Sequence, residues 1–169
     1  MKIGNALLAA TLAAAVPQVF AHGTGAHAPK PGTHGAQSVE EKPFGRPGDP
    51  KKVTRTIPIE MSDEMDFAPN GVRVRAGETV RFVVRNRGRR MHELVLGTME
   101  ELQAHAELMR KHPTMEHDEP YMAHVAPGRT GTIVWQFTTP GVFYYGCLVP
   151  GHFEAGMIGI VRVLPSRSR

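Results

Sequence analysis

The sequence contains a single cysteine, Cys147, among its 169 residues. It therefore cannot form an internal disulfide, and Cys147 is a buried apolar residue, a reactive thiol or a metal ligand. A continuous basic tract is also missing, although the net charge is +4 and the pI is near 9.5. The densest basic group, residues 81–90, alternates with Val and Phe, as the polar face of a strand does. Nucleic-acid binding is therefore not expected, and the basic surface favours an acidic partner instead.

The sequence also lacks an apolar run long enough to span a membrane. The Ala/Leu-rich segment near the N-terminus is short and is interrupted by Pro17. Lys2 precedes this segment, and small residues lie near its end at Val19 and Ala21, which is the pattern of a secretory signal peptide. We therefore predict a signal peptide at residues 1–21, a periplasmic location and no membrane span after cleavage, with His22 as the new N-terminus.

Residues 22–52 contain few large apolar side chains and are rich in Gly, Pro, Ala, His and Lys. Such a segment cannot bury enough apolar surface to offset the entropy lost on ordering. We therefore predict a disordered arm over residues 22–52 and a folded domain over residues 53–169.

The remaining sequence is dominated by short segments typical of β-strands. Apolar and polar residues alternate, or β-branched and aromatic residues gather, between Gly- and Pro-containing turns. These segments cover residues 53–61, 72–86 (two strands about a turn at 76–78), 91–97, 128–139, 141–147 and 157–164. Short strands at this spacing predict an all-β protein with a Greek-key β-sandwich.

One segment has a helical pattern instead. Thr98 and Glu101 have the spacing of a capping box, and Pro113 ends the pattern, so we predict one inserted helix near residues 98–112. Its apolar face would contain Met99, Leu102, Ala106 and Met109. A Met- and His-rich loop is expected to follow, over residues 112–124.

The segment "CLVPGHFEAGM" gathers three metal-binding side chains in eleven residues: Cys147, His152 and Met157. A thiolate, an imidazole and a thioether suit copper in either oxidation state. A trigonal blue-copper centre also needs a second histidine. The best candidate is His92, at the start of a predicted strand, while His117 and His124 in the long loop remain alternatives.

The segments "FAPNGVRVRAGETVRFVVRNRGRRMHELVLG" and "PGVFYYGCLVPGHFEAGMIGIVRV" resemble the two halves of a cupredoxin, a small blue (type 1) copper protein. The resemblance covers roughly residues 53–164 and implies a cupredoxin-like sandwich with one type 1 copper. The copper ligands that it implies are His92, Cys147, His152 and Met157. The exported, His-rich arm and the ligand segments are most similar to periplasmic cupredoxins associated with bacterial copper tolerance.

One position departs from the family pattern. Many cupredoxins have Asn directly after the first copper histidine, where it links the two ligand loops, whereas this chain has Glu93. An ionised carboxylate accepts hydrogen bonds but cannot donate them. The bonding between the two loops is therefore expected to differ.

The resemblance implies a monomeric, non-enzymatic protein that acts in one-electron transfer and copper tolerance. Its redox partner would be a cytochrome or a copper oxidase, docking around Pro150, Gly151 and Phe153. The chain has no His-x-His or His-Cys-His pair, which multicopper oxidases and copper nitrite reductases need, and a dinuclear copper domain would need two cysteines.

The alternative function is copper storage or delivery without a main role in electron transfer. A second, weakly bound copper is an open alternative at two places. One is the arm, with His22, His27 and His34. The other is the Met- and His-rich loop region, where a solvated loop with two methionines in the core is the simpler expectation; its candidate ligands are Met109, His112, Met115, His117, Met122 and His124.

Overall fold

The computed structural model describes residues 41–113, 115 and 117–167, so the predicted signal peptide and residues 22–40 of the predicted arm lie outside the described residues. The described residues form two five-stranded β-sheets and one α-helix. The strands are β1 (Arg46–Pro47), β2 (Arg55–Ser62), β3 (Asp66–Ala68), β4 (Gly71–Arg75), β5 (Thr79–Asn86), β6 (His92–Gly97), β7 (Met122–Val125), β8 (Thr130–Gln136), β9 (Gly141–Gly146) and β10 (Ile158–Leu164). The helix α1 spans Met99–Lys111, and a short 3₁₀-helix, η1, spans Pro50–Lys52.

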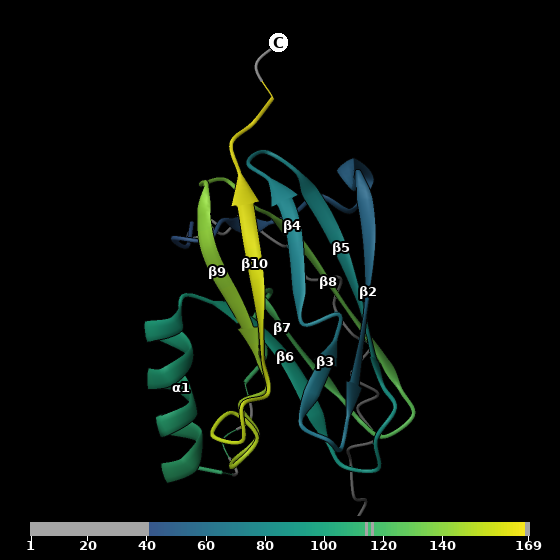
Figure 1. The fold of residues 1–169 in the computed structure, drawn as a ribbon, viewed down its shortest axis with the longest axis vertical. Coiled ribbons are helices and arrows are strands. Elements are labelled where there is room, and N and C mark those ends of the chain that lie inside the picture. The colour runs from purple at the N-terminus through teal and green to yellow at the C-terminus, as the bar shows by residue number, and fades with distance from the viewer. Residues whose placement is uncertain (1–40, 114, 116, 168–169) are drawn as a thin grey trace, which may run out of the picture. The chain divides into compact units, whose positions relative to one another are not determined.

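The two sheets face each other as a β-sandwich (Figure 1). The first has the strand order β1-β8-β5-β2-β3 and the second the order β4-β10-β9-β6-β7. The pairs β2–β5 and β4–β10 are parallel, and the other pairs are antiparallel. The predicted all-β sandwich with one inserted helix is therefore confirmed.

The strands form a sandwich because their apolar residues alternate with the two-residue period of a strand. In β5, Val80, Phe82 and Val84 are fully buried between the sheets, and Trp135 of β8 is buried beside them. Burying an apolar side chain of this size contributes about 1.5–3 kcal/mol. The central core therefore holds the two sheets together and fixes their register.

The helix α1 begins and ends as its sequence predicts. Thr98 accepts a hydrogen bond from the Glu101 backbone N–H, and the Glu101 carboxylate accepts one from Thr98 N–H, which completes the capping box. Leu102, Ala106 and Met109 are the buried residues of the helix. They form a second apolar cluster with Val95, Met122 and Leu148, so the helix covers part of the second sheet and contacts the loop after β9.

The predicted arm extends too far toward the C-terminus. Within residues 41–52, the Phe44 ring is 1 % exposed and stacks on Trp135, with ring centroids 5.2 Å apart. Trp135 Nε1–H donates to the Phe44 carbonyl at 3.0 Å, and β1 pairs with β8. One aromatic residue therefore anchors a segment whose average composition favours disorder.

The predicted loop at residues 112–124 also contains a strand. β7 pairs with β6, and His124 lies directly opposite Glu93. Only Met122 and Val125 of this four-residue strand are buried, so its alternation is too short to stand out in a Met- and His-rich sequence. In the described part of the chain, no helix has the length and apolar character needed to cross a membrane.

Candidate metal centre

Three of the predicted ligands meet at one end of the sandwich. His92 begins β6, while Cys147 and His152 lie in the loop between β9 and β10, at the bottom of Figure 1. The ligand atoms of the three residues lie within 4.8 Å of one another, and all three side chains are buried. The pairing of β6 with β9, in which Val95 lies opposite Gly146, brings these distant segments together.

The two distances from the thiol to the imidazoles are close to those of a site with a single copper ion. Cys147 Sγ lies 3.8 Å from His92 Nδ1 and 3.3 Å from His152 Nδ1. Metal–nitrogen and metal–sulfur bonds of about 2.0–2.3 Å separate the ligands of a trigonal site by roughly 3.5–4 Å. One thiolate and two imidazoles form the trigonal donor set of blue-copper proteins.

The loop before His92 is organised by a buried asparagine. Asn86 Nδ2 donates to the carbonyl oxygens of Arg90 and Val125, at 2.7 and 2.8 Å, and Asn86 Oδ1 accepts from Gly88 N–H at 2.8 Å. A Cβ atom at Gly88 would collide with the Asp63 carboxylate, so the close approach of the two loops requires glycine there. The turn Asn86–Gly88 therefore sets where β6 begins and where His92 lies.

Asp63 orients the His92 ring. Its Oδ1 lies 3.1 Å from His92 Nε2, and its carboxylate also accepts the backbone N–H groups of Arg89 and Arg90. The hydrogen bond from Arg89 N–H, followed by that from His92, lowers the pKa of Asp63 to about 2. An ionised carboxylate at Nε2 keeps the proton there and leaves the lone pair of Nδ1, on the side of Cys147, free to bind a metal. No local sequence pattern indicates Asp63, because it is 29 residues from His92.

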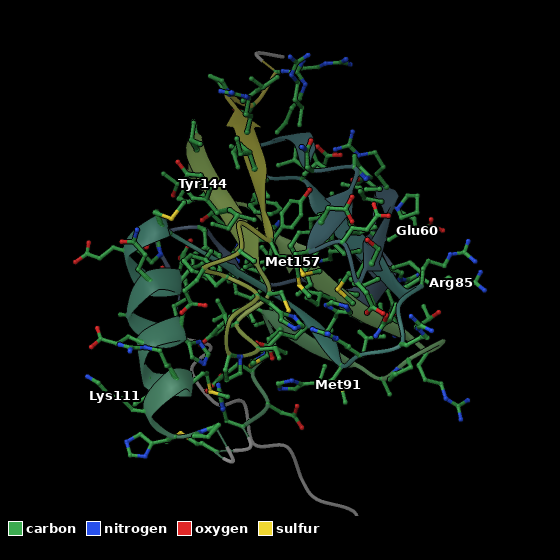
Figure 2. The ribbon with its side chains drawn as sticks, turned by 60° about the horizontal axis from the view of Figure 1, so that its bottom comes forward. Glu60, Arg85, Met91, Lys111, Tyr144 and Met157 are labelled. Carbon is green, nitrogen blue, oxygen red and sulfur yellow. The ribbon has the colours of Figure 1, made fainter. Side chains whose placement is uncertain are left out.

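The β9–β10 loop holds its side chains through backbone hydrogen bonds. Cys147 N–H donates to the Met157 carbonyl, and Met157 N–H donates to the His152 carbonyl, both at 3.1 Å. Gly151 and Gly156 adopt positive φ angles of 87° and 92°, which favour glycine. Met157 is fully buried and lies near the middle of the fold in Figure 2, whereas Met91 lies toward the rim. Met157 is thus bonded through its backbone to both Cys147 and His152.

Burial shifts the pKa values of two of the three donors. It raises the pKa of the Cys147 thiol to about 12, and the nearby Glu93 carboxylate adds to this rise. Burial also lowers the pKa of His152, with a further contribution from His92. The metal-free site therefore favours a neutral thiol and a neutral His152. Because a thiol must lose its proton to bind a metal, a bound copper ion would take the place of the thiol proton.

Glu93 links the two ligand loops with its carboxylate. Its Oε1 accepts the Leu148 backbone N–H at 2.8 Å, and its own backbone N–H points to Cys147 Sγ at 3.4 Å. Its Oε2 lies 2.8 Å from His124 Nδ1. In the Leu148 contact the Glu93 carboxylate acts as a hydrogen-bond acceptor. Burial raises the pKa of Glu93, and the nearby His124 opposes that rise.

His117 and His124, the alternative ligands, lie outside the group of His92, Cys147 and His152. Together with His105 they form a separate histidine cluster. His105 Nε2 and His117 Nε2 are 2.7 Å apart, and His124 Nε2 lies 3.0 Å from the His117 carbonyl oxygen. Burial, followed by the neighbouring His117, lowers the pKa of His105. His117 Nδ1 is buried and has no hydrogen-bond partner among the described residues. Of the suggested loop ligands, Met109 and Met122 lie in the second apolar cluster instead.

The remaining candidates are placed as follows. His22, His27 and His34 of the arm lie outside the described residues. Pro150 and Gly151 are exposed beside His152, whereas Phe153 is half-buried against Gly146. The predicted docking residues therefore differ in exposure.

Comparison with known proteins identifies the family. Residues 54–164 match the model of copper-binding proteins of the plastocyanin/azurin family. The copper-resistant cuproprotein CopI of Rubrivivax gelatinosus is 55 % identical over 123 residues, which cover 73 % of this chain and 74 % of that protein. The CopI protein of Pseudomonas aeruginosa is 32 % identical, with 77 % of this chain and 87 % of that protein covered.

Solved structures agree on the fold. Auracyanin from Roseiflexus castenholzii superposes with a TM-score of 0.58 at 21 % identity, covering 67 % of this chain and 99 % of that one. Auracyanin B gives a TM-score of 0.59 at 20 % identity, covering 76 % of this chain and all of that one. With a His-Cys-His site in a cupredoxin sandwich and these relatives, the chain belongs to the copper-binding plastocyanin/azurin family, and within it to the CopI cuproproteins.

Proposed function

We propose that this protein is a periplasmic type 1 copper protein that carries single electrons and contributes to copper resistance. The observation that carries the proposal is the convergence of one thiol and two imidazoles, from segments 55 residues apart, in a buried site. The names of the CopI relatives, which describe copper-resistant cuproproteins, support the part in resistance.

The residues present have distinct roles in this proposal. His92, Cys147 and His152 would hold the copper, and Met157 would offer a weak thioether ligand to it. Bound copper supplies a one-electron couple between Cu(I) and Cu(II). Asp63 keeps the His92 ring in one orientation, and the hydrogen bonds of the β9–β10 loop hold the other ligands. A site fixed in this way needs little rearrangement when the charge of the ion changes.

The proposed protein is not an enzyme, and it acts as a monomer with a redox partner such as a cytochrome or a copper oxidase. The partner would dock at Pro150, Gly151 and Phe153, because this part of the loop lies beside His152, which is 6 % exposed. The periplasmic location rests on the predicted signal peptide at residues 1–21.

Voltammetry of the copper-loaded protein tests electron transfer, with Met157→Gln as the informative variant. We expect a reversible one-electron couple without loss of copper in the parent protein. Gln offers a harder oxygen donor than the thioether. We therefore expect Cu(II) to be stabilised relative to Cu(I) and the reduction potential to fall. Copper should stay bound, because the three strong ligands remain. Met61→Gln is the matched control, since Met61 is also fully buried in the core but lies in β2. An equal potential in the parent and Met157→Gln would mean that Met157 is only a core residue.

A second candidate function, copper storage or delivery, is favoured by the cluster of His105, His117 and His124. Three imidazoles gathered beside the type 1 site are more than electron transfer requires. The arm, with its three further histidines, supports the same function.

Removal of the arm separates the two candidates. The full mature chain is expected to take up at least one more copper at neutral pH than a chain that begins at Glu41. His22 would offer an amine and an imidazole, which chelate copper only when both are deprotonated. The extra copper should therefore be lost as the pH falls, while the visible spectrum is unchanged.

Replacing His22, His27 and His34 by Ala in the full-length chain is the control for a length effect. If the two chains bind equal amounts of copper, the arm has no role in copper binding. If cells with the shortened protein lose copper tolerance while its spectrum is intact, the arm takes part in copper handling.

A further inference from the structure

A buried carboxylate lies next to the proposed copper ligands without belonging to them. The Glu93 side chain is only 3 % exposed. Its Oε1 accepts the Leu148 backbone N–H at 2.8 Å. This N–H belongs to the peptide group that joins Cys147 to Leu148, so Glu93 holds the main chain directly after the thiol. Its own backbone N–H points to Cys147 Sγ at 3.4 Å.

The second carboxylate oxygen is held just as closely. Glu93 Oε2 lies 2.8 Å from His124 Nδ1, and the two residues are directly opposite each other in the β6–β7 pair. His124 is itself fixed, because its Nε2 lies 3.0 Å from the His117 carbonyl oxygen. Both oxygens of the carboxylate therefore have partners, and the side chain has one orientation.

We propose that Glu93 is a positioning residue for the copper centre. Held in place by His124, its carboxylate fixes the Cys147–Leu148 peptide group and thereby the direction from which Cys147 Sγ meets the copper. This inference rests on the proposed role of Cys147 as a ligand. It gives His124 a role in the support of the type 1 site.

The place of Leu148 next to Cys147 distinguishes a positioning role of Glu93 from a general effect on the stability of the fold. An unsatisfied N–H at Leu148 would be buried, since Leu148 is 1 % exposed, and the chain would move to find another acceptor. Any such movement displaces Cys147, the adjacent residue. A carboxylate elsewhere in the sandwich would affect stability without this consequence.

Glu78 is the matched control. It accepts the Arg75 backbone N–H at 2.8 Å and lies 3.2 Å from Arg55 Nε, so it too joins a backbone N–H to a cationic side chain. It precedes β5, whose other end, Asn86, leads to His92. Its contacts are therefore of the same kind but lie at the opposite end of the strand.

The test compares Glu93→Ala, Glu93→Gln, His124→Ala and Glu78→Ala in the full-length, copper-loaded protein. Two properties are measured: the positions and relative heights of the visible absorption bands, and the rate of copper loss to a chelator. Glu93→Ala is expected to shift the bands and to speed copper loss on the order of tenfold, the effect of about one charge-assisted hydrogen bond. Glu78→Ala should change neither property.

Glu93→Gln should stay close to the parent protein in both properties. Its amide oxygen can accept the Leu148 N–H, and its amide N–H can donate to His124 Nδ1. His124→Ala is expected to lie between the parent and Glu93→Ala, because the carboxylate keeps one of its two partners.

The results show whether Glu93 is a positioning residue. If Glu93→Ala matches Glu78→Ala, Glu93 is a structural residue only, and the positioning role is overturned while the copper assignment stands. If Glu93→Ala does not fold, the other two variants decide. Altered bands in Glu93→Gln together with parent-like bands in His124→Ala would overturn the positioning role. Parent-like bands in Glu93→Gln together with altered bands in His124→Ala would support it. A parent protein without a thiolate-to-copper band would instead refute the proposed function itself.

Discussion

Replacing Cys147 by Ser is expected to abolish the intense visible absorption of the copper-loaded protein. This absorption arises from the bond between the thiolate and copper, and a serine hydroxyl does not replace a soft thiolate. The β-sandwich should remain, because the two side chains are nearly equal in size. A buried hydroxyl without a new partner costs about 1–3 kcal/mol of stability. Titration with Cu(II), followed by absorption spectroscopy, measures the loss.

Tyr145→Phe is the matched control for this experiment. Tyr145 is fully buried in β9, two residues before Cys147, and its hydroxyl donates to the Pro69 carbonyl at 2.6 Å. The variant also loses one polar atom from the core but leaves all the proposed ligands in place. We expect it to keep the visible bands. A coloured copper site in Cys147→Ser, with the circular dichroism of a folded sandwich, would show that the thiol is not a ligand.

The largest expected effect on stability comes from Phe44→Ala. The ring is 1 % exposed and contacts Trp135, Phe143 and Tyr121. Truncating a buried Phe costs about 3–5 kcal/mol through lost apolar burial and the cavity left behind. Urea unfolding of the metal-free protein measures this loss of unfolding free energy. The visible spectrum of the copper-loaded variant should not change, since β1 pairs with the end of β8 that lies opposite the start of β5.

Chain length provides the control for Phe44. A chain that begins at Lys51 lacks the ring and should be destabilised about as much as Phe44→Ala, whereas a chain that begins at Glu41 should retain its stability. Phe44→Leu should lose less, because it fills more of the cavity. Equal unfolding free energies for the two shortened chains would mean that residues 41–50 add nothing to the fold.

Most of the fold follows from patterns that are local in the sequence. The alternation in residues 72–86 predicts β4 and β5, and the capping box of Thr98 and Glu101 predicts the start of α1. Phe44 escaped prediction because its effect depends on Trp135, which is 91 residues away. The strand β7 escaped because its partner β6, rather than its own composition, makes it a strand.

The residues of the candidate site also divide into those that a local sequence pattern predicts and those that depend on contacts between distant segments. Cys147, His152 and Met157, three of the four predicted ligands, share one loop, so their spacing indicates them together, and the position of His92 at the start of a strand indicates the fourth predicted ligand. Asp63 and His124 carry no such signal. Each matters only through one contact, with His92 and Glu93 respectively, and these contacts exist only once the strands are paired. A carboxylate in place of the family's usual amide at Glu93 was the one sequence signal for this supporting network.

The contact between Leu148 and the helix α1 bears on protein engineering. Cys147 belongs to the central core, while the next side chain, Leu148, belongs to the cluster beneath the helix. The segment from Cys147 to Met157 therefore cannot be transferred to another protein on its own. Grafted onto a sandwich without such a helix, it would expose Leu148 to water, and its first turn would have no fixed path. A designer who transfers this loop must transfer Leu102, Ala106 and Met109 with it, or replace Leu148 by a polar residue.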